Sequence, residues 1–333
     1  MSRSLLSLSA TAILSGGTAL ADVPKVAVDI APVHSLVARV MDGVGEPDLI
    51  VQPGASPHEY SLRPSEAAAL QAADLVLWMG KDLTPWMEGA IDTLATNASV
   101  TTLLEADGVK LLDFREGALF EAHDHDDHEE HAKDDDHEEH ASDKDHDHDH
   151  EEHAHDDHAG HDHGEHDPHA WLSPENASTW LNVIAAQLSA VDPGNAGSYF
   201  ANASAARTEM EALSAEIKAT LEPARGGSFI VFHDAYQYFE SDFDFPASGA
   251  ISISDASDPS PARIAEMQGR IREEGVDCVL AEPQFNAGLV AAVLDGTDAN
   301  TGVIDPLGAM LEPGKALYPQ LLLNMAKTLA ECL

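Results

Sequence analysis

Residues 25–79 read KVAVDIAPVHSLVARVMDGVGEPDLIVQPGASPHEYSLRPSEAAALQAADLVLWM, and this stretch decides the fold. Its apolar runs of strand length are Lys25–Ile30, Asp48–Gln52 and Asp74–Met79. The helix-like stretches around them are Val33–Met41, Pro64–Ala72 and Pro85–Leu94, the last two with Pro where a first helical turn tolerates it. Strands that alternate with helices predict a parallel sheet covered by helices.

The second half of the chain repeats this alternation. A helix is expected to start at Ser173-Pro174-Glu175 and to break at Asp192-Pro193, before a long helical stretch at Asn195–Leu221. The strand candidates that follow are Phe229–Phe232, Ala250–Ser254, Cys278–Ala281 and Gly302–Ile304, with helices near Pro261–Glu273, Asn286–Leu294 and Lys315–Leu329. We therefore expect an α/β protein with an N-terminal lobe at 22–192, a linking backbone helix at 193–224 and a C-terminal lobe at 225–333. Ligands of such sheets bind beyond the carboxyl ends of the strands, here in the cleft between the lobes.

The first 21 residues have the features of a secretory signal peptide. Arg3 precedes an apolar, small-residue run, and Ala19-Leu20-Ala21 fits the small-x-small cleavage rule. The mature chain is expected to begin near Asp22 and to reside in the periplasm. Without a Cys near the cleavage point, we do not expect a lipid anchor, and no later apolar run is long enough to span a bilayer.

A histidine- and acid-rich insertion interrupts the N-terminal lobe at 121–166. Residues 123–166 contain 15 of the 19 histidines and 20 Asp or Glu against 2 Lys, which accounts for much of the net charge of −42. Such a composition cannot bury enough apolar surface to offset its ordering entropy, so it predicts a disordered loop. One interpretation is a low-affinity zinc collector, with candidate ligands His146, His148, His150, His153, His155, His158, His161 and His163. The other is a solvated acidic loop without a specific role.

The strong negative charge excludes nucleic acid as a partner, because phosphates require a basic face. The two cysteines, Cys278 and Cys332, form an even pair in an exported protein, and such a pair predicts a disulfide. This bridge would join the C-terminal helix to a core strand.

Only four histidines lie outside the insertion, and three of them occupy strand-end or turn segments. His58 lies in GASPHEYSLRPSE, His169 in DPHAWLSPENA, and His233 at the end of the apolar run FIVFH. Asp305, in GVIDPLG, also directly follows a strand. Three neutral imidazoles and one carboxylate suit tetrahedral zinc. His34, at a helix start, is interpreted as structural.

The stretches GASPHEYSLRPSE, DPHAWLSPENA, FHDAYQYFE, LAEPQF and IDPLG together resemble the zinc-specific periplasmic solute-binding proteins of ABC importers. The resemblance covers essentially the whole mature chain and implies two lobes joined by a rigid helix, with Zn²⁺ held between them. It implies that His58, His169 and His233 are metal ligands.

The fourth ligand is not fixed by the resemblance. Some family members place a Glu ligand immediately before the first His, where this chain has Pro57. Asp305 matches a carboxylate ligand of other members and is the preferred choice, with water as the alternative. Glu59 and Glu282 are candidates to support the ligands from behind. Manganese-binding relatives tend to have a carboxylate where this chain has His233, so His233 points to zinc.

The sequence therefore predicts a binding protein and not an enzyme, with a membrane permease as its partner. A periplasmic zinc chaperone is a further candidate partner, and the chain is expected to be a monomer. Two alternatives stay open: a zinc hydrolase, and a manganese-binding protein or metal-binding adhesin of the same fold. Against the hydrolase, neither HExxH nor GxSxG occurs.

Overall fold

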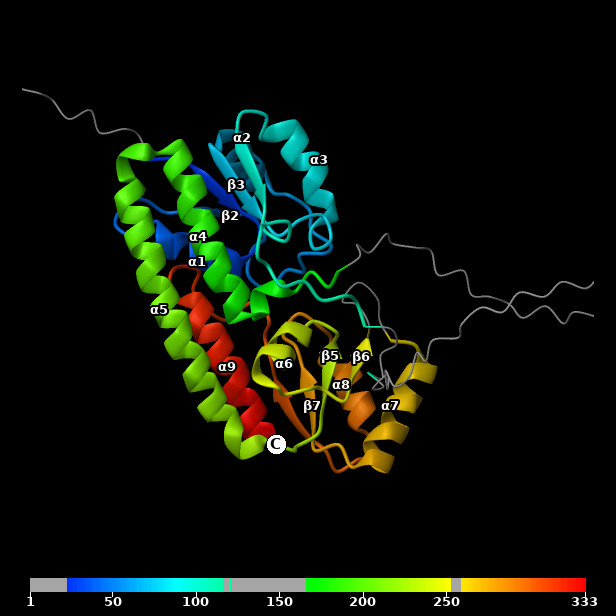
Figure 1. Ribbon diagram of the computed structural model, residues 1–333. Coiled ribbons are helices and arrows are strands. Elements are labelled where there is room, and N and C mark those ends of the chain that lie inside the picture. The colour runs from blue at the N-terminus through cyan, green and yellow to red at the C-terminus, as the bar shows by residue number, and fades with distance from the viewer. Residues whose placement is uncertain (1–22, 116–119, 121–165, 253–258) are drawn as a thin grey trace, which may run out of the picture.

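The computed structural model describes residues 23–115, 120, 166–252 and 259–333 (Figure 1). The predicted signal peptide and the eight candidate zinc collectors of the insertion lie outside these residues. The described chain contains two parallel four-stranded sheets with the same connectivity, β2-β1-β3-β4 and β6-β5-β7-β8. Each sheet and its covering helices form one lobe, which confirms the predicted α/β class.

The N-terminal sheet consists of β1 (Val26–Val28), β2 (Asp48–Leu49), β3 (Leu75–Trp78) and β4 (Ser99–Thr102). The C-terminal sheet consists of β5 (Phe229–His233), β6 (Gly249–Ser252), β7 (Cys278–Ala281) and β8 (Asn300–Val303). The helices are α1 (Ala31–Val40), α2 (Pro64–Ala72), α3 (Pro85–Leu94), α4 (Pro174–Val191), α5 (Ala196–Leu221), α6 (Gln237–Phe243), α7 (Pro261–Glu274), α8 (Ala287–Leu294) and α9 (Leu317–Cys332).

The central strands are apolar on both faces because helices cover both faces. In β5, for example, Phe229 and Val231 pack into a core shared with α1, α4, α5 and α9, whereas Ile230 and Phe232 pack toward α7 and α8. The N-terminal sheet divides its side chains in the same way, with α2 and α3 on its outer face. The shared core runs without interruption from one lobe to the other.

Helix α5 is the backbone that spans both lobes (Figure 1). Its 26 residues extend over about 39 Å. Tyr199, Met210 and Leu221, spread from one end of the helix to the other, are all buried in the shared core. The helix therefore packs against both lobes along its length. No described helix combines the length and apolar character needed to cross a bilayer.

Two elements escape sequence-based prediction. Strand β4 has the sequence SVTT and is half-exposed at a sheet edge, so it lacks the apolar run that marks its neighbours. Helix α6 has only seven residues, QYFESDF, and is too short to show a helical period. The expected strands near 250–254 and 302–304 are present but begin earlier, at Gly249 and Asn300.

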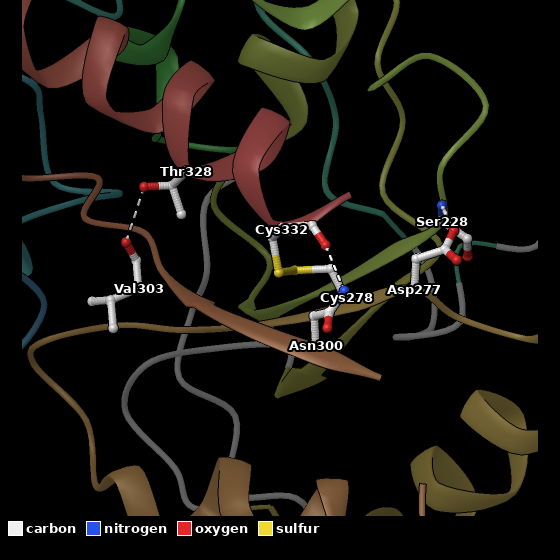
Figure 2. The surroundings of a disulfide bond; sticks show 7 residues. All are labelled: Ser228, Asp277, Cys278, Asn300, Val303, Thr328 and Cys332. Carbon is white, nitrogen blue, oxygen red and sulfur yellow. Dashed lines mark hydrogen bonds between the residues drawn. A yellow bond between two sulfur atoms is a disulfide. The ribbon is translucent and has the colours of Figure 1, made fainter. Parts of the chain in front are cut away.

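The predicted disulfide is confirmed, and Figure 2 shows that it joins the start of β7 to the last turn of α9. Cys278 and Cys332 have their Cα atoms 5.7 Å apart. Beside the bridge, Asn300 Nδ2 donates to the carbonyl oxygen of Cys332 at 3.0 Å, and Thr328 Oγ1 donates to that of Val303 at 3.3 Å (Figure 2). The C-terminal helix is thereby fixed across strands β7 and β8.

Candidate metal-binding site

Three imidazoles that are far apart in the sequence meet at one pocket. His58 lies in the turn between β2 and α2, His169 directly precedes the short 3-10 turn Ala170–Leu172, and His233 is the last residue of β5. All three line the same pocket between the lobes. His169 and His233 are each 5% exposed, whereas His58 is half-buried on the solvent side.

The spacing of the rings is close to that of imidazoles that share a zinc ion. The ring centroid of His169 lies 5.5 Å from that of His58 and 5.4 Å from that of His233. A zinc–nitrogen bond of about 2.05 Å puts each centroid about 3.2 Å from the metal, so two ligands at the tetrahedral angle have centroids about 5.2 Å apart. The observed separations are only a few tenths of an ångström wider. Within the described ranges, no group of three His, Cys, Asp or Glu side chains has the geometry of a complete metal site.

Two of these rings each have a carboxylate at Nδ1. Asp167 Oδ1 lies 2.7 Å from Nδ1 of His169 and also accepts from the backbone N–H of His169 at 2.9 Å. Glu282 Oε1, just after β7, lies 2.7 Å from Nδ1 of His233. An ionised carboxylate can only accept, so when each acid is ionised Nδ1 of its ring bears the proton and Nε2 keeps its lone pair. Each ring therefore offers Nε2 as a metal ligand.

Both supporting carboxylates are buried, Asp167 at 2% exposure and Glu282 at 4%. Burial raises the pKa of Asp167 to about 7, opposed by the hydrogen bond from the backbone of His169 and by the charge of Arg115. A dication on the adjacent ring would favour the ionised carboxylate. Burial disfavours the negative charge of Asp167, and a cation bound nearby would compensate that charge.

Aromatic and proline residues form the walls of the pocket. The Trp171 Nε1–H donates to the carbonyl oxygen of Pro306 at 2.8 Å and so joins the segment after His169 to the loop after β8. The Phe285 ring lies 5.5 Å from that of His233, centroid to centroid. Trp86 donates to the carbonyl oxygen of Pro57 at 2.7 Å, which holds the turn that presents His58.

Asp305 lies next to this pocket and lines a neighbouring one on the side of α9. Its Oδ1 accepts from the backbone N–H groups of Leu307 and Gly308, at 3.1 and 2.9 Å, and from Gln284 Nε2 at 3.3 Å. Leu307 and Gln284 themselves line the imidazole pocket. The loop that contains Asp305 therefore borders the site.

Two buried side-chain oxygens at the pocket have hydrogen-bonding capacity that no described residue uses. Glu282 Oε2 and Gln284 Oε1 are buried and, among the described residues, have no hydrogen-bond partner. Buried polar atoms are normally paired with protein groups or ordered water, so these oxygens are candidates to interact with a ligand or its hydration water.

The remaining residues singled out from sequence take other places. Glu59 is exposed and is not one of the residues that line the pocket. His34 is buried away from the pocket, where its Nε2 lies 3.0 Å from the carbonyl oxygen of Pro47. Sequence reasoning missed Asp167, whose only signal is its place two residues before a candidate ligand histidine in DPHAW. It also missed Arg115, for which the sequence offers no signal.

Two α/β lobes on a shared backbone helix, with three imidazoles converging between them, define a metal-capturing, two-lobed binding protein. Comparison with known proteins supports this class. The profile of the family described as zinc-uptake complex component A, periplasmic (ZnuA), matches residues 26–332. The high-affinity zinc uptake system protein ZnuA of Brucella abortus (strain 2308) is 46% identical, with 97% of each chain covered. The corresponding protein of Paracoccus denitrificans is also 46% identical, over 95% of this chain and 93% of its own.

A solved structure described as ZnuA superposes with a TM-score of 0.70 and covers 93% of this chain and 99% of its own, at 21% identity. This likeness shows the fold. The sequence matches show the family, and the chain belongs to the periplasmic zinc-uptake component A (ZnuA) family.

Proposed function

We propose that this protein captures Zn²⁺ in the periplasm and delivers it to an ABC-type importer in the membrane. The proposal rests on one observation above the others: three imidazoles from separate segments lie at ring separations of 5.5 and 5.4 Å in one pocket. Imidazole nitrogen favours zinc over manganese, which prefers oxygen. The family and the close relatives, which are named for zinc uptake, support the same cargo.

In this proposal the ion exchanges its water for Nε2 of His58, His169 and His233. Asp167 and Glu282 fix the tautomer of the two buried rings, so little reorientation is needed when the ion arrives. His58, the most exposed of the three rings, would complete this set of ligands. Because α5 packs in a core shared by both lobes, we expect loading to involve side chains and loops more than a wide opening of the lobes.

Asp305 is our proposed fourth ligand, with a water molecule as the alternative. Its Oδ1 is already engaged by three donors, so Oδ2 would be the ligand atom. The negative charge of Asp305 contributes to the raised pKa of Tyr236, whose ring lies beside that of His233. This contribution supports the nearness of Asp305 to the site. The variant Asp305→Asn separates the two alternatives. If Asp305 is the fourth ligand, zinc affinity should fall at least tenfold. If water is the fourth ligand, affinity should fall less than threefold.

The test of zinc capture is competition with a chelator that buffers free zinc in the nanomolar range, so that weak sites stay empty. His169→Gln and His233→Gln should each lose at least 100-fold in affinity, because each removes one of the proposed ligands. His34→Gln is the matched control, a buried histidine outside the pocket, and should bind zinc like the wild-type protein. Unchanged affinity in both pocket variants would refute the site.

Binding without catalysis is part of the proposal. Incubation of the zinc-loaded protein with ester and peptide substrates should give no turnover above that of free zinc. Turnover that the His233→Gln variant loses would favour the zinc hydrolase instead.

We further propose that residues 1–21 direct export. The N-terminal lobe then ends at residue 192, and the C-terminal lobe begins at residue 225, after the linking helix. The importer's permease is the proposed partner, with a zinc chaperone as a second candidate, and the protein acts as a monomer. Light scattering of the purified mature chain tests the monomer, and sequencing of its N-terminus tests cleavage near Asp22.

The histidine-rich insertion is proposed to collect zinc weakly and raise its concentration near the pocket, as tethering does for any ligand. Deletion of residues 123–166 should leave one tight site and remove several weak ones. Isothermal titration that finds the same stoichiometry before and after deletion would contradict this role.

A further inference from the structure

The two ends of the histidine-rich insertion are joined where the chain leaves and re-enters the described fold. We call residues 112–115 and 166–167 the insertion root. Its two strands are held by an antiparallel bridge between Asp113 and His166, whose side chains also pair at 2.9 Å, and by the Asp167 N–H, which donates to the carbonyl oxygen of Leu112 at 2.8 Å. The root is thus a defined piece of structure.

The insertion root is packed on α6, in the C-terminal lobe. Tyr238 Oη accepts from the backbone N–H of Leu112 at 3.0 Å and donates to the carbonyl oxygen of Asp167 at 2.8 Å, so it joins both strands of the root. In the amide orientation that satisfies its neighbours, Gln237 donates to Asp167 Oδ2 and to the carbonyl oxygen of Asp113, at 3.1 Å each. A segment that follows the N-terminal sheet is therefore fixed to the helix that follows β5.

Arg115 makes the strongest of these connections. Its guanidinium donates to both carboxylate oxygens of Asp234, from Nε at 3.1 Å and from Nη2, and to both of Glu240, at 2.8 and 3.1 Å. The side chains are largely buried, at 16% exposure for Arg115, 9% for Asp234 and 6% for Glu240. The Phe120 ring covers the guanidinium, with Cζ 3.5 Å from the ring centroid. A planar fork that binds two carboxylates at once fixes their relative position.

Both acids that Arg115 binds belong to the segment that presents His233. Asp234 is the next residue, and Glu240 lies on α6 and also accepts from the backbone N–H of Ala247 at 3.1 Å. On its other side, the root continues through Asp167 directly into His169. Arg115 therefore links the segment that positions His169 to the segment that positions His233.

We propose that Arg115 is a positioning residue of the zinc site, which locks the segment of His233 to the insertion root and so sets the His169–His233 separation. The inference rests on the proposed zinc capture at this pocket. Removal of the guanidinium would leave Asp234 and Glu240 buried without their cation, and the β5–α6 turn would shift to hydrate them. The shift displaces Nε2 of His233 from the ion, so zinc dissociates faster from a protein that is still folded.

A purely structural ion pair is the competing explanation, and it predicts lost stability with unchanged zinc binding. Arg225, which precedes β5, offers a control because it binds the other end of α6, although it is more exposed than Arg115. It pairs with Glu222 at 2.7 Å and donates to the carbonyl oxygens of Asp244 and Phe243, at the end of α6 away from His233. Arg225→Met therefore disturbs α6 without touching the insertion root.

The experiment measures zinc affinity and zinc dissociation rate for Arg115→Met, Arg115→Lys and Arg225→Met, as full mature chains. Free zinc is buffered in the nanomolar range, and unfolding of each zinc-free variant is measured in parallel. Arg115→Met should lose at least tenfold in affinity, through faster dissociation. Arg115→Lys should fall between, at threefold or more, because an ammonium cannot hold two carboxylates in place. Arg225→Met should stay within twofold of wild type despite lost stability.

Affinity within twofold of wild type for both Arg115 variants would overturn the proposal, as would an equal loss in Arg225→Met. If Arg115→Met does not fold, the result for Arg115→Lys decides alone by the same limits. Failure of the wild-type chain to retain zinc under these conditions would instead refute the proposed function itself.

Discussion

The role of Glu282 can be tested by Glu282→Gln, which removes a charge and keeps the shape of the side chain. In the structure Glu282 Oε1 lies 2.7 Å from Nδ1 of His233 and is also reached by the backbone N–H of His233 at 3.3 Å. The amide oxygen of Gln can still accept both hydrogen bonds. The variant therefore isolates the contribution of the negative charge behind the ring.

The magnitude follows from the distance between that charge and the ion. A zinc on Nε2 of His233 would lie about 6.7 Å from the carboxylate oxygen, given the ring size, the 2.7 Å contact at Nδ1 and a zinc–nitrogen bond of about 2.05 Å. Coulomb's law for charges of −1 and +2 at that distance gives about 1.2 kcal/mol in a medium like water and about 5 kcal/mol at an effective dielectric constant of 20. Partners that orient metal ligands typically contribute 10- to 100-fold in affinity, about 1.4 to 2.7 kcal/mol, which lies inside this interval. We expect Glu282→Gln to weaken zinc binding by that factor.

The assay is chelator competition at neutral pH, with unfolding of the zinc-free protein measured alongside. Glu59→Gln is the matched control, because Glu59 adjoins a proposed ligand but is exposed and does not line the pocket. It should change affinity by less than twofold. A Glu282→Gln variant that binds zinc as tightly as wild type would refute the argument, and so would equal losses in the two variants.

Further outcomes follow from other parts of the structure. Replacement of Cys278 and Cys332 by Ala should lower the free energy of unfolding by up to about 4 kcal/mol, from the entropy of the 54-residue loop that the bridge closes, with zinc affinity unchanged. Chemical denaturation of both proteins measures this difference. Zinc affinity should fall as the pH drops below about 6.5, because only neutral imidazoles bind the ion, and a flat affinity between pH 7 and 5 would contradict the imidazole shell. Burial raises the pKa of Asp29 to about 7, so the folded protein retains a proton that the unfolded chain releases above its ordinary value of 3.8. Stability should therefore decline as pH rises from about 4 to 7, and the decline should be smaller in Asp29→Asn, as urea unfolding across that window would show. Trp171→Phe, which deletes the donor to Pro306, should raise zinc dissociation severalfold, measured by chelator trapping.

Much of the candidate site was predictable because its candidate ligands are marked locally. His58 follows a strand in a Gly- and Pro-rich turn, and His233 ends an apolar strand. Such positions are expected at a binding site, because ligands bind beyond the carboxyl ends of parallel strands. The partners behind the rings were less visible. Glu282 follows a strand and could be suspected, but Asp167 resembles any loop acid, and its bond to His169 depends on how the insertion root packs.

The sequence by itself determined the alternation of strands and helices, the backbone helix and the three candidate imidazoles. These features depend on short-range patterns of apolar residues and turns, which survive without knowledge of distant contacts. The tertiary structure alone decided that Arg115 lies against Asp234 and Glu240, more than 100 residues away, and that Asp305 borders the imidazole pocket. Those positions result from packing between segments that no local pattern links, because the free energy of such contacts depends on the whole folded core.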